Sequence, residues 1–525
     1  MMLSPFKNAP YLNFALETDR RQMLSALEKV KSELGKTYGL GRGEVISSTN
    51  RKTLKSVNPA DPSQIIGTVE VASKEDAFSA LERMTKGSYE WKRTPVEKRV
   101  ELVEKLADWM EARRNEISAL MVYEVGKNWR EADADTCEGI DFCRYYAREM
   151  SRLSQTRVTQ VVQGELDTLS YHPRGVCVVI APWNFPFAIL TGMAVAGLIT
   201  GNTVVIKPAE QSPIIGAKLA QGLREVGFPD SSYCFLPGIG EEIGPVLVDD
   251  PRTDMIVFTG SAAVGLSIIE SAARKPHPAQ RGVKKVIAEM GGKNALIIDE
   301  DADLDEALLG ALHSAFGFQG QKCSALSRLL VHEKVYEAFV KRFVEAVKAY
   351  KCGTPLRPEF QVGPVIDEEA QQRILKTIED GKRRMKVLYE CGEVPREGYF
   401  VPPTVFECTD SQEHLFQNEI FGPVLLVKKV KSVEEGVELA NSVRYALTGG
   451  IYSRSQSKID FVRREMEVGN LYINRPITGA IVERHPFGGF KLSGVGSKAG
   501  GPDYLIQFME PKTVSENTVR RGFAG

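Results

Sequence analysis

Hydrophobic residues in the middle of the chain are broken up in a way that predicts buried strands and helices. No charged residue lies between Arg174 and Lys207, a run long enough to imitate a membrane span. Prolines near its start and a Gly-Asn pair near its end divide the run into strand, turn, helix, turn and strand, at residues 176–181, 182–186, 187–199, 201–202 and 203–206. Strands that are apolar throughout are typical of a fully buried βαβ unit, so we expect no membrane span here.

The same alternation continues after this unit. The pattern predicts a helix at 212–226, a strand at 233–236, and a strand at 256–258 that enters a helix through small residues. Alternating strands and helices over 175–290 indicate a parallel, doubly wound nucleotide-binding sheet. A second α/β alternation begins at Asn294, with helices predicted at 304–316 and 333–350 and strands near 329–331, 424–429 and 471–473. We therefore predict an α/β protein.

Shorter patterns flank these two regions. The first 60 residues are polar, with a helix predicted at 17–33 and a Gly-rich turn at 39–43, and further helices follow at 74–85, 96–113, 114–125 and 128–150. Residues 157–172 alternate, turn at Gly164 and alternate again, which is the pattern of a β-hairpin. The tail, residues 504–514, is expected to form an edge strand or a short strand pair.

Composition narrows the class of protein. The chain has 525 residues, a formal net charge of −1 and 43% hydrophobic residues, as in a globular protein of two to three domains. The balanced charge favours neither nucleic acid nor an anionic membrane as a partner. The eight cysteines include no Cys-x-x-Cys pair, and the N-terminus resembles neither a secretory signal nor a transit peptide. We therefore expect a cytoplasmic protein.

One short stretch suggests a catalytic nucleophile. Cys323 ends a Gly-punctuated turn, with Lys322 on one side and Ser324 on the other. A neighbouring ammonium favours the thiolate, the form that attacks carbon. About 30 residues upstream, Glu289 ends a predicted strand at a Gly-Gly bend. We predict that Cys323 and Glu289 are the two halves of one active site.

Other polar residues stand at predicted strand ends, where open α/β sheets bind ligands. Thr259-Gly260-Ser261 precedes a helix, whose N-terminus can hold an anion. Lys207 and Glu210 follow another strand, and a carboxylate there can accept hydrogen bonds from ribose hydroxyls. If each motif is considered separately, a surface ion pair is the simpler interpretation. Asn184, between two prolines, is either an oxyanion donor or an amide that caps a turn.

Two other motif classes are not supported. The string Gly238-Ile-Gly240-Glu-Glu-Ile-Gly244 has one residue too many for a dinucleotide fingerprint, so we interpret it as the start of a helix. None of the six histidines is spaced as part of a metal-ligand set. We predict no metal.

Taken together, these strings resemble the aldehyde dehydrogenase superfamily over nearly the whole chain. The shared motifs are Pro182-Trp-Asn-Phe-Pro186, Lys207-Pro-Ala-Glu210, Phe258-Thr-Gly-Ser261, Glu289-Met-Gly-Gly-Lys293, Gly320-Gln-Lys-Cys323, Glu419-Ile-Phe421-Gly-Pro and Pro486-Phe-Gly-Gly489. Segments around Cys323, Thr478–Val482 and Gly500–Leu505 are most similar to the glutamate-γ-semialdehyde (Δ1-pyrroline-5-carboxylate) dehydrogenases within that superfamily. One departure is His485, where Gln commonly precedes the Pro-Phe-Gly-Gly motif.

The resemblance implies a division of the chain into three parts. A Rossmann-type, NAD-binding domain would comprise residues 1–156 and 173–290, and a second α/β domain, the catalytic one, residues 291–500. Residues 157–172 and 501–525 would form a small bridging sheet that drives dimerisation.

It also implies roles for individual residues, with NAD as the cofactor. Cys323 would attack the aldehyde, Asn184 and the Cys323 backbone N–H would hold the oxyanion, and Glu289 would activate water. The residues expected to bind the cofactor are Pro182, Trp183, Lys207, Glu210, Thr259, Gly260, Ser261, Glu419 and Phe421. Those expected to bind the carboxylate, ammonium and methylenes of glutamate semialdehyde are Glu138, Phe185, Lys322, Ser324, Gly479, Ala480 and Phe487.

Two alternatives remain. The chain could oxidise another semialdehyde or a general aldehyde, or it could be a non-catalytic structural or binding protein that kept the fold. As partners we expect a small-molecule substrate, a second copy of the chain, and a separate proline dehydrogenase.

Overall fold

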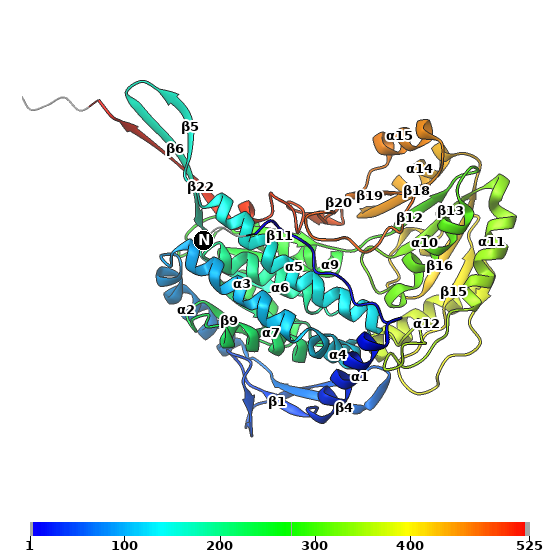
Figure 1. Ribbon diagram of the computed structural model, residues 1–525, viewed down its shortest axis with the longest axis horizontal. Helices are drawn as coiled ribbons and strands as arrows, with labels where there is room; N and C mark the ends of the chain where they lie inside the picture. The colour runs from blue at the N-terminus through cyan, green and yellow to red at the C-terminus, as the bar shows by residue number, and fades with distance from the viewer. Residues whose placement is uncertain (1–3, 275, 520–525) are drawn as a thin grey trace, which may run out of the picture.

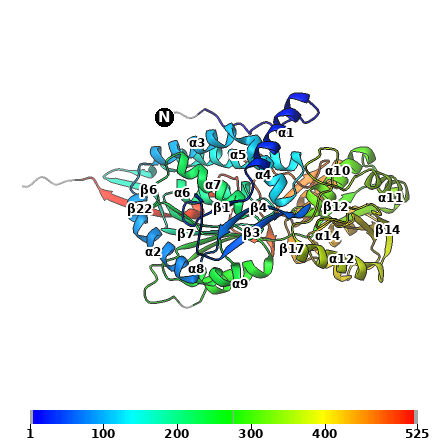
Figure 2. The ribbon, with the colours of Figure 1, turned by 90° about the horizontal axis from the view of Figure 1, so that it is seen from below.

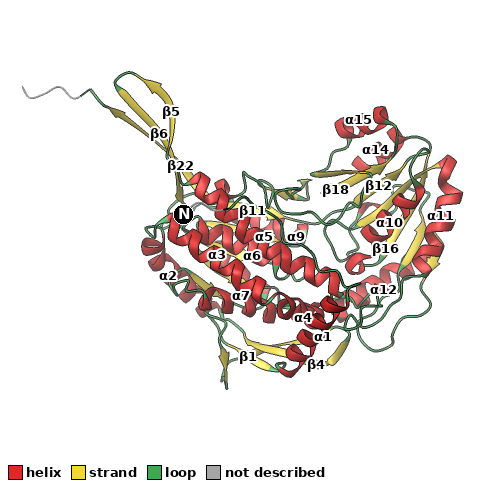
Figure 3. Ribbon diagram, in the orientation of Figure 1, coloured by secondary structure: helices red, strands yellow, loops and turns green. Residues whose placement is uncertain are grey.

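Two large sheets and three small ones organise the computed structural model, which describes residues 4–274 and 276–519 (Figures 1 and 3). The smallest sheet contains only β17 (Tyr445–Ala446) and β20 (Phe490–Lys491). The ends of the predicted outer segments, residues 1–3 and 520–525, lie outside the described residues. Among the described helices, none combines the length and apolar character that a membrane crossing demands.

The first large sheet has six strands in the order β21-β11-β10-β7-β8-β9. Its strands are β7 (Val176–Ile180), β8 (Thr203–Lys207), β9 (Tyr233–Phe235), β10 (Met255–Thr259), β11 (Lys285–Glu289) and β21 (Gly494–Val495). All neighbours are parallel except β21, which pairs antiparallel with β11. The strand order reverses direction between β7 and β10, and this reversal creates a crevice at the carboxyl ends of the strands.

Helices cover both faces of this sheet, and Figure 2 shows the two layers. One face carries α2 (Lys74–Trp91), α8 (Gly240–Asp249) and α9 (Ala262–Ala272). The other carries α6 (Ala188–Ile199) and α7 (Pro213–Glu225), with an outer layer of α1 (Glu17–Ser32), α3 (Val96–Ala112), α4 (Arg114–Val125) and α5 (Trp129–Leu153). The uncharged segment after Arg174 is thus the predicted βαβ unit, β7-α6-β8, with both strands buried.

The second large sheet has seven strands in the order β14-β15-β16-β13-β12-β18-β19. They are β12 (Asn294–Ile298), β13 (Leu326–His332), β14 (Lys386–Glu390), β15 (Thr404–Glu407), β16 (Val424–Val430), β18 (Thr448–Tyr452) and β19 (Asn470–Ile473). One face packs on α10 (Leu304–Phe316) and α11 (Glu333–Lys348), and the other on α12 (Glu368–Lys382), α13 (His414–Gln417), α14 (Val433–Asn441) and α15 (Gln456–Glu465). The predicted elements of this half are present, and β14, β15, β18, α12, α13, α14 and α15 are additional.

A four-stranded sheet near the N-terminus differs from the prediction of a polar segment with one turn. Its strands are β1 (Lys36–Tyr38), β2 (Val45–Ile46), β3 (Thr53–Asn58) and β4 (Asp61–Glu70). These strands are only partly buried, and their sequences lack the continuous apolar runs found in the strands of the two large sheets. This is why the sequence pattern did not predict them.

A three-stranded sheet projects from the body of the molecule (Figure 1). It contains the predicted hairpin, β5 (Arg157–Val162) and β6 (Glu165–Pro173), and the tail strand β22 (Met509–Asn517). The first part of the predicted tail strand is instead a short 3₁₀ helix, Leu505–Phe508. Val161, which is 90% exposed, belongs to a group of apolar side chains that this sheet leaves open to solvent.

Candidate functional site

Cys323 and Glu289 line the same cavity. Cys323 lies in the loop that links the 3₁₀ turn Gly317–Gly320 to β13, in the second sheet. Glu289 is the last residue of β11, in the first sheet. The two side chains therefore reach the cavity from different sheets, which is the arrangement that a nucleophile and a base acting on one carbon require.

Sheet register fixes the place of Glu289. It is paired with Thr259 at the end of β10, and its backbone carbonyl accepts a hydrogen bond of 3.1 Å from the N–H of Gly260. On its other side it pairs with Gly494 of β21. Because the carboxyl ends of β10 and β11 coincide, the predicted cofactor residues and the predicted base share one edge of the sheet.

The carboxyl group of Glu289 favours its protonated form. Its Oε2 is buried and has no hydrogen-bond partner among the described residues. Burial raises the pKa of Glu289 to about 8, although the nearby charge of Lys498 opposes the shift. A side chain at Gly488 would begin 2.9 Å from Oε1, so the glycine leaves room for this carboxyl. A carboxyl with a pKa near neutrality can act as a general base.

The thiol of Cys323 differs from the prediction. Burial and the negative charges of Glu419 and Glu289 raise its pKa, and Lys322 is not among the groups that lower it. The Lys322 ammonium instead lies 2.7 Å from Oε1 of Glu131 on α5. The structure therefore gives no support to the expectation that Lys322 favours the thiolate, because the charge of Lys322 is paired with Glu131.

Asn184 lies against the loop that carries the thiol. Its side chain is buried, and Nδ2 donates a hydrogen bond of 3.0 Å to the carbonyl of Gln321, two residues before Cys323. This bond uses one of the two amide hydrogens and leaves the other available to a developing oxyanion.

The residues predicted to hold the cofactor's adenosine half follow β8 and β10. Nζ of Lys207 lies 3.0 Å from Oε1 of Glu210, and that oxygen also accepts a hydrogen bond of 2.6 Å from the N–H of Gly240, the first residue of α8. Ser261 caps α9, and its hydroxyl accepts a hydrogen bond of 3.4 Å from the N–H of Val264. Polar groups with these chemistries fit a dinucleotide, and the carboxylate of Glu210 disfavours a 2′-phosphate.

Glu419 is held between the two large sheets. Its Oε1 accepts a hydrogen bond of 2.9 Å from the N–H of Gly292, and a side chain at Gly291 would begin 2.3 Å from Oε2. Burial raises the pKa of Glu419 to about 7. Phe421 has a φ of 57° and meets Trp183 edge-on at 5.6 Å between ring centroids. Trp183 and Phe421, two of the predicted cofactor residues from distant parts of the chain, are thus neighbours.

Comparisons with known proteins agree with this geometry. Residues 45–514 match the family model described as "Aldehyde dehydrogenase family". The chain belongs to the aldehyde dehydrogenase family. A 1-pyrroline-5-carboxylate dehydrogenase from Geobacillus sp. (strain WCH70) is 46% identical over 98% of this chain and 100% of that protein.

Solved structures of similar aldehyde dehydrogenases have the same fold. A 1-pyrroline-5-carboxylate dehydrogenase from Thermus with bound NAD superposes with a TM-score of 0.95 at 45% identity, covering 98% of this chain and 100% of that one. Proline utilization A from Bdellovibrio bacteriovorus gives a TM-score of 0.96 at 49% identity. The match covers all of this chain but only 55% of that protein.

The same cavity of this aldehyde dehydrogenase contains most of the predicted substrate residues. Glu138, Phe185, Ser324, Gly479, Ala480 and Phe487 line it, and Lys322 does not. Burial raises the pKa of Glu138 to about 8, with the charge of Asp135 acting in the same direction. Gly479 has a φ of 74°, and no atom lies within 4 Å of where a side chain would begin.

Several lining residues were missed from the sequence. They are Phe142, Tyr146, Ile189, Gly192, Met193, Ala499 and Tyr504. Phe142 and Tyr146 follow Glu138 on α5 at helical spacing, a signal that could have identified them. Also missed was a fully buried ion pair, Lys127–Asp135, at 2.9 Å. Its ammonium lies 3.8 Å from the centroid of the Phe185 ring and supports that wall of the cavity.

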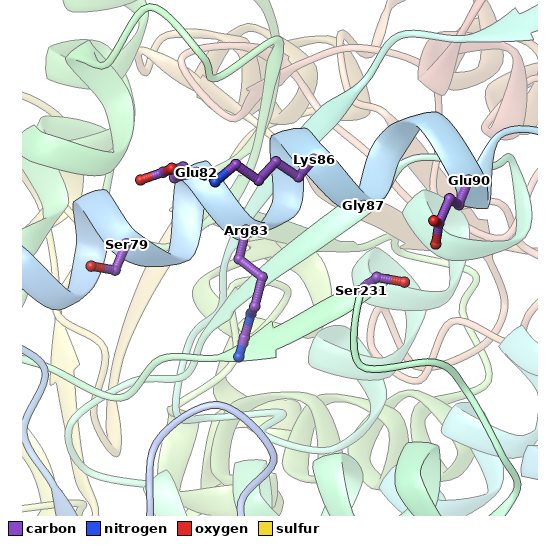
Figure 4. A pocket seen from close by; sticks show the side chains of 7 residues that line it. All are labelled: Ser79, Glu82, Arg83, Lys86, Gly87, Glu90 and Ser231. Carbon is purple, nitrogen blue, oxygen red and sulfur yellow. Dashed lines mark hydrogen bonds and ion pairs between the residues drawn. The ribbon is translucent and has the colours of Figure 1, made fainter.

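Two other features lie outside this cavity. A surface hollow along α2 contains Glu82, Arg83, Lys86 and Glu90, with Ser231 on the facing loop (Figure 4). Its charges have both signs, and none of its residues lines the Cys323 cavity. Among the described residues, Asp299, Glu300 and His332 form a group that could ligate a metal. The ammonium of Lys458 already forms ion pairs with both carboxylates, 2.8 Å from Asp299 and 3.1 Å from Glu300. The absence of a metal remains a prediction.

Proposed function

We propose that this protein oxidises L-glutamate γ-semialdehyde, which is in equilibrium with 1-pyrroline-5-carboxylate, to L-glutamate with NAD. The observation that supports the proposal best is that one cavity contains Cys323 and Glu289 together with Glu138 and Gly479. Cys323 and Glu289 can serve as the nucleophile and the base that oxidation of an aldehyde needs. Glu138 and the backbone at Gly479 can bind the ammonium and the carboxylate of an amino acid. The names and the near full-length coverage of the similar dehydrogenases favour the same substrate.

The chemistry begins at the thiol. Cys323 loses its proton, its sulfur bonds to the aldehyde carbon, and the carbonyl oxygen becomes an oxyanion. The free amide hydrogen of Asn184 and the Cys323 backbone N–H stabilise that charge. NAD, when bound, supplies the acceptor for the hydride that leaves the same carbon. A thioester to Cys323 remains.

The second half of the reaction needs a base. Glu289 takes a proton from a water molecule, the resulting hydroxide adds to the thioester carbon, and the carbon–sulfur bond breaks. The acid is released and the sulfur is ready for another cycle. In this proposal Glu419 and Phe421 position the nicotinamide ribose and ring, and Lys207, Glu210 and Ser261 hold the adenosine half and the pyrophosphate. The other residues proposed to contact the cofactor are Pro182, Trp183, Thr259 and Gly260.

The tail of the substrate accounts for specificity. Backbone N–H groups at Gly479 and Ala480, with the hydroxyl of Ser324, are suited to its carboxylate. The carboxyl of Glu138 is suited to its ammonium, and Phe185 and Phe487 to its methylenes. A site built to pair buried polar groups rejects analogues without them by on the order of 10⁴.

Steady-state assays of NADH formation test the proposal. We expect kcat/KM for glutamate semialdehyde to exceed that for propanal by on the order of 10⁴, and Cys323→Ala to abolish both activities. Equal efficiencies for the two aldehydes would favour a general aldehyde dehydrogenase. Wild type and Cys323→Ala with the same NADH production would favour a structural or binding protein.

Two partners belong to the same proposal. The apolar side chains exposed on the β5-β6-β22 sheet suit a second copy of the chain, giving at least a dimer. A separate proline-oxidising dehydrogenase would supply the pyrroline. A cytoplasmic location remains a prediction.

A further inference from the structure

Residues 4–14 run extended along α5 in the opposite direction to the helix, and we call them the N-terminal strap (dark blue in Figure 1). Successive strap residues meet successive turns of α5. The contacting pairs are Ser4 with Arg148, Phe6 with Tyr145, Ala9 with Asp141, Pro10 with Cys137, Leu12 with Asp133 and Phe14 with Trp129. The strap is thus fastened along most of the helix.

One strap side chain reaches beyond the helix. Nδ2 of Asn8 donates a hydrogen bond of 2.8 Å to Oδ2 of Asp141 and another of 3.0 Å to the backbone carbonyl of Val482. Asp141 and Val482 are each 4% exposed. A buried carboxylate and a buried carbonyl both require donors, and a single amide nitrogen satisfies them together.

The two groups that Asn8 joins belong to two different segments, α5 and the loop after Ile477, and each segment contributes residues to the cavity. Asp141 lies on α5 between Glu138 and Phe142, which both line the cavity. Val482 follows Gly479 and Ala480, which also line the cavity. Within the described chain, the backbone of this loop is also tied at Ile477, to the Ser314 hydroxyl, and at Glu483, to the Gly500 carbonyl. The loop therefore reaches α5 by two bridges among the described residues, one through Asn8 and one through Gly500, whose N–H donates a hydrogen bond of 3.0 Å to the hydroxyl of Tyr146.

We propose that Asn8 is a positioning residue that sets the separation between the ammonium-binding and carboxylate-binding walls of the substrate cavity. The inference rests on the proposed function, because only a substrate with both charged groups spans the two walls. Asn8 itself does not line the cavity, so it acts through Asp141 and Val482. A displacement of about 1 Å in such an anchor is enough to weaken binding of the correctly charged tail.

Substitution of Asn8 should leave the strap in place. The strap's backbone still donates to Asp141 from Ala9 at 2.7 Å and to Asp133 from Leu12 at 2.8 Å. Its aromatic contacts, Phe6 with Tyr145 and Phe14 with Trp129, are also independent of Asn8. The variants are therefore expected to fold, and a thermal melt checks this.

The test compares Asn8→Ala, Asn8→Asp and wild type with glutamate semialdehyde and with propanal. We expect both variants to raise KM for glutamate semialdehyde by roughly 10-fold, with kcat and the propanal kinetics within about 2-fold of wild type. Asn8→Asp has the same size but cannot donate, and its carboxylate would face Asp141. The matched control is Asn13→Ala, another strap asparagine, whose side chain accepts only from the N–H of Ala15.

The outcomes separate the inference from the proposed function. If wild type does not prefer glutamate semialdehyde, the proposed function fails. If wild type prefers it and Asn8→Ala or Asn8→Asp keeps the wild-type KM, the inference fails alone. Equal losses of activity on both aldehydes, or the same KM increase in Asn13→Ala, would show a general structural role of the strap and would also overturn it.

Discussion

The ammonium of Lys322 lies 2.7 Å from the carboxylate of Glu131, which belongs to α5. Both members of the pair are largely buried, with side chains 5% and 11% exposed. Burial alone would raise the pKa of Glu131, but the charges of Lys322, His313 and Lys127 together with the hydrogen bond from Lys322 outweigh it, and the pKa falls to about 2. Lys322, in the active-site loop, therefore neutralises the charge of Glu131 on α5.

Breaking this ion pair should destabilise the protein. Lys322→Met leaves a buried carboxylate without its partner, which we expect to lower the free energy of unfolding by roughly 3 kcal/mol. The double variant Lys322→Met/Glu131→Gln should recover part of the loss, as measured by thermal or denaturant unfolding. Lys348→Met is the control, since its pair with Glu345 is exposed and worth at most about 1 kcal/mol.

The same variant tests how the thiol is activated. If Lys322 does not act on Cys323, the pH midpoint of Cys323 alkylation by iodoacetamide should be the same in Lys322→Met and in wild type. An upward movement of that midpoint by about one unit would restore a direct role for the ammonium.

Activity should increase with pH. Because burial raises the pKa of Glu289 to about 8, its carboxyl is protonated at lower pH, and the basic form appears as pH rises through that value. The raised pKa of Cys323 acts in the same direction, since its thiolate also forms at higher pH. We expect kcat to rise between about pH 6 and pH 9, and stopped-flow measurement of NADH absorbance would detect it. A flat profile over that range would contradict the raised pKa of the base.

Glu289→Gln separates the two half-reactions. Oxidation does not need the base, so this variant should give one burst of NADH per active site. Thioester hydrolysis should then be slower than in wild type by roughly 10²–10⁴. Loss of the burst as well would mean that Glu289 also acts before hydride transfer.

The bend after Glu289 should tolerate no side chain at its second glycine. At Gly292 a Cβ would lie 2.4 Å from the carbonyl oxygen of Cys323 and 2.7 Å from Oδ1 of Asn294. Gly292→Ala must displace the nucleophile's backbone, so we expect kcat to fall by at least roughly 100-fold. Gly244→Ala is the matched control, because no atom lies within 4 Å of its Cβ position in α8. Comparable activity in the two alanine variants would disprove the close contact.

Cofactor preference should depend on Glu210. Glu210→Gln keeps the shape and the hydrogen-bond acceptor for Gly240 but removes the charge that would repel a 2′-phosphate. We expect the ratio of kcat/KM with NAD to kcat/KM with NADP to fall by roughly tenfold, equivalent to about 1.4 kcal/mol. An unchanged ratio would show that another group makes the discrimination.

The sequence predicted the parts of the fold whose pattern is local. The uncharged run after Arg174 could only be a buried βαβ unit, and Glu289 could be placed at a strand end because Gly291 and Gly292 follow it. The N-terminal sheet was missed because its short strands are half exposed and show no regular alternation of apolar and polar residues. The strap was missed because its backbone is satisfied by side chains of α5 rather than by a regular ladder.

The sequence was enough to predict which residues belong to the site, but not where each of their side chains points. Cys323 and Glu289 do share a cavity, and six of the seven predicted tail-binding residues line it. Lys322 does not, since neighbours in sequence can point to opposite sides of a loop. The Lys127–Asp135 pair could not be assigned to the site because nothing local shows that Phe185 packs on it.

The antiparallel strand β21 has a consequence for the order of folding. Glu289 is flanked by Thr259 from the preceding strand and by Gly494 from a much later part of the polypeptide. Long-range pairings of this kind form slowly, because a large loop must close first. During refolding, enzyme activity should therefore return later than most of the circular-dichroism signal of the helices. It should return only when β21 has paired with β11 at the edge of the six-stranded sheet.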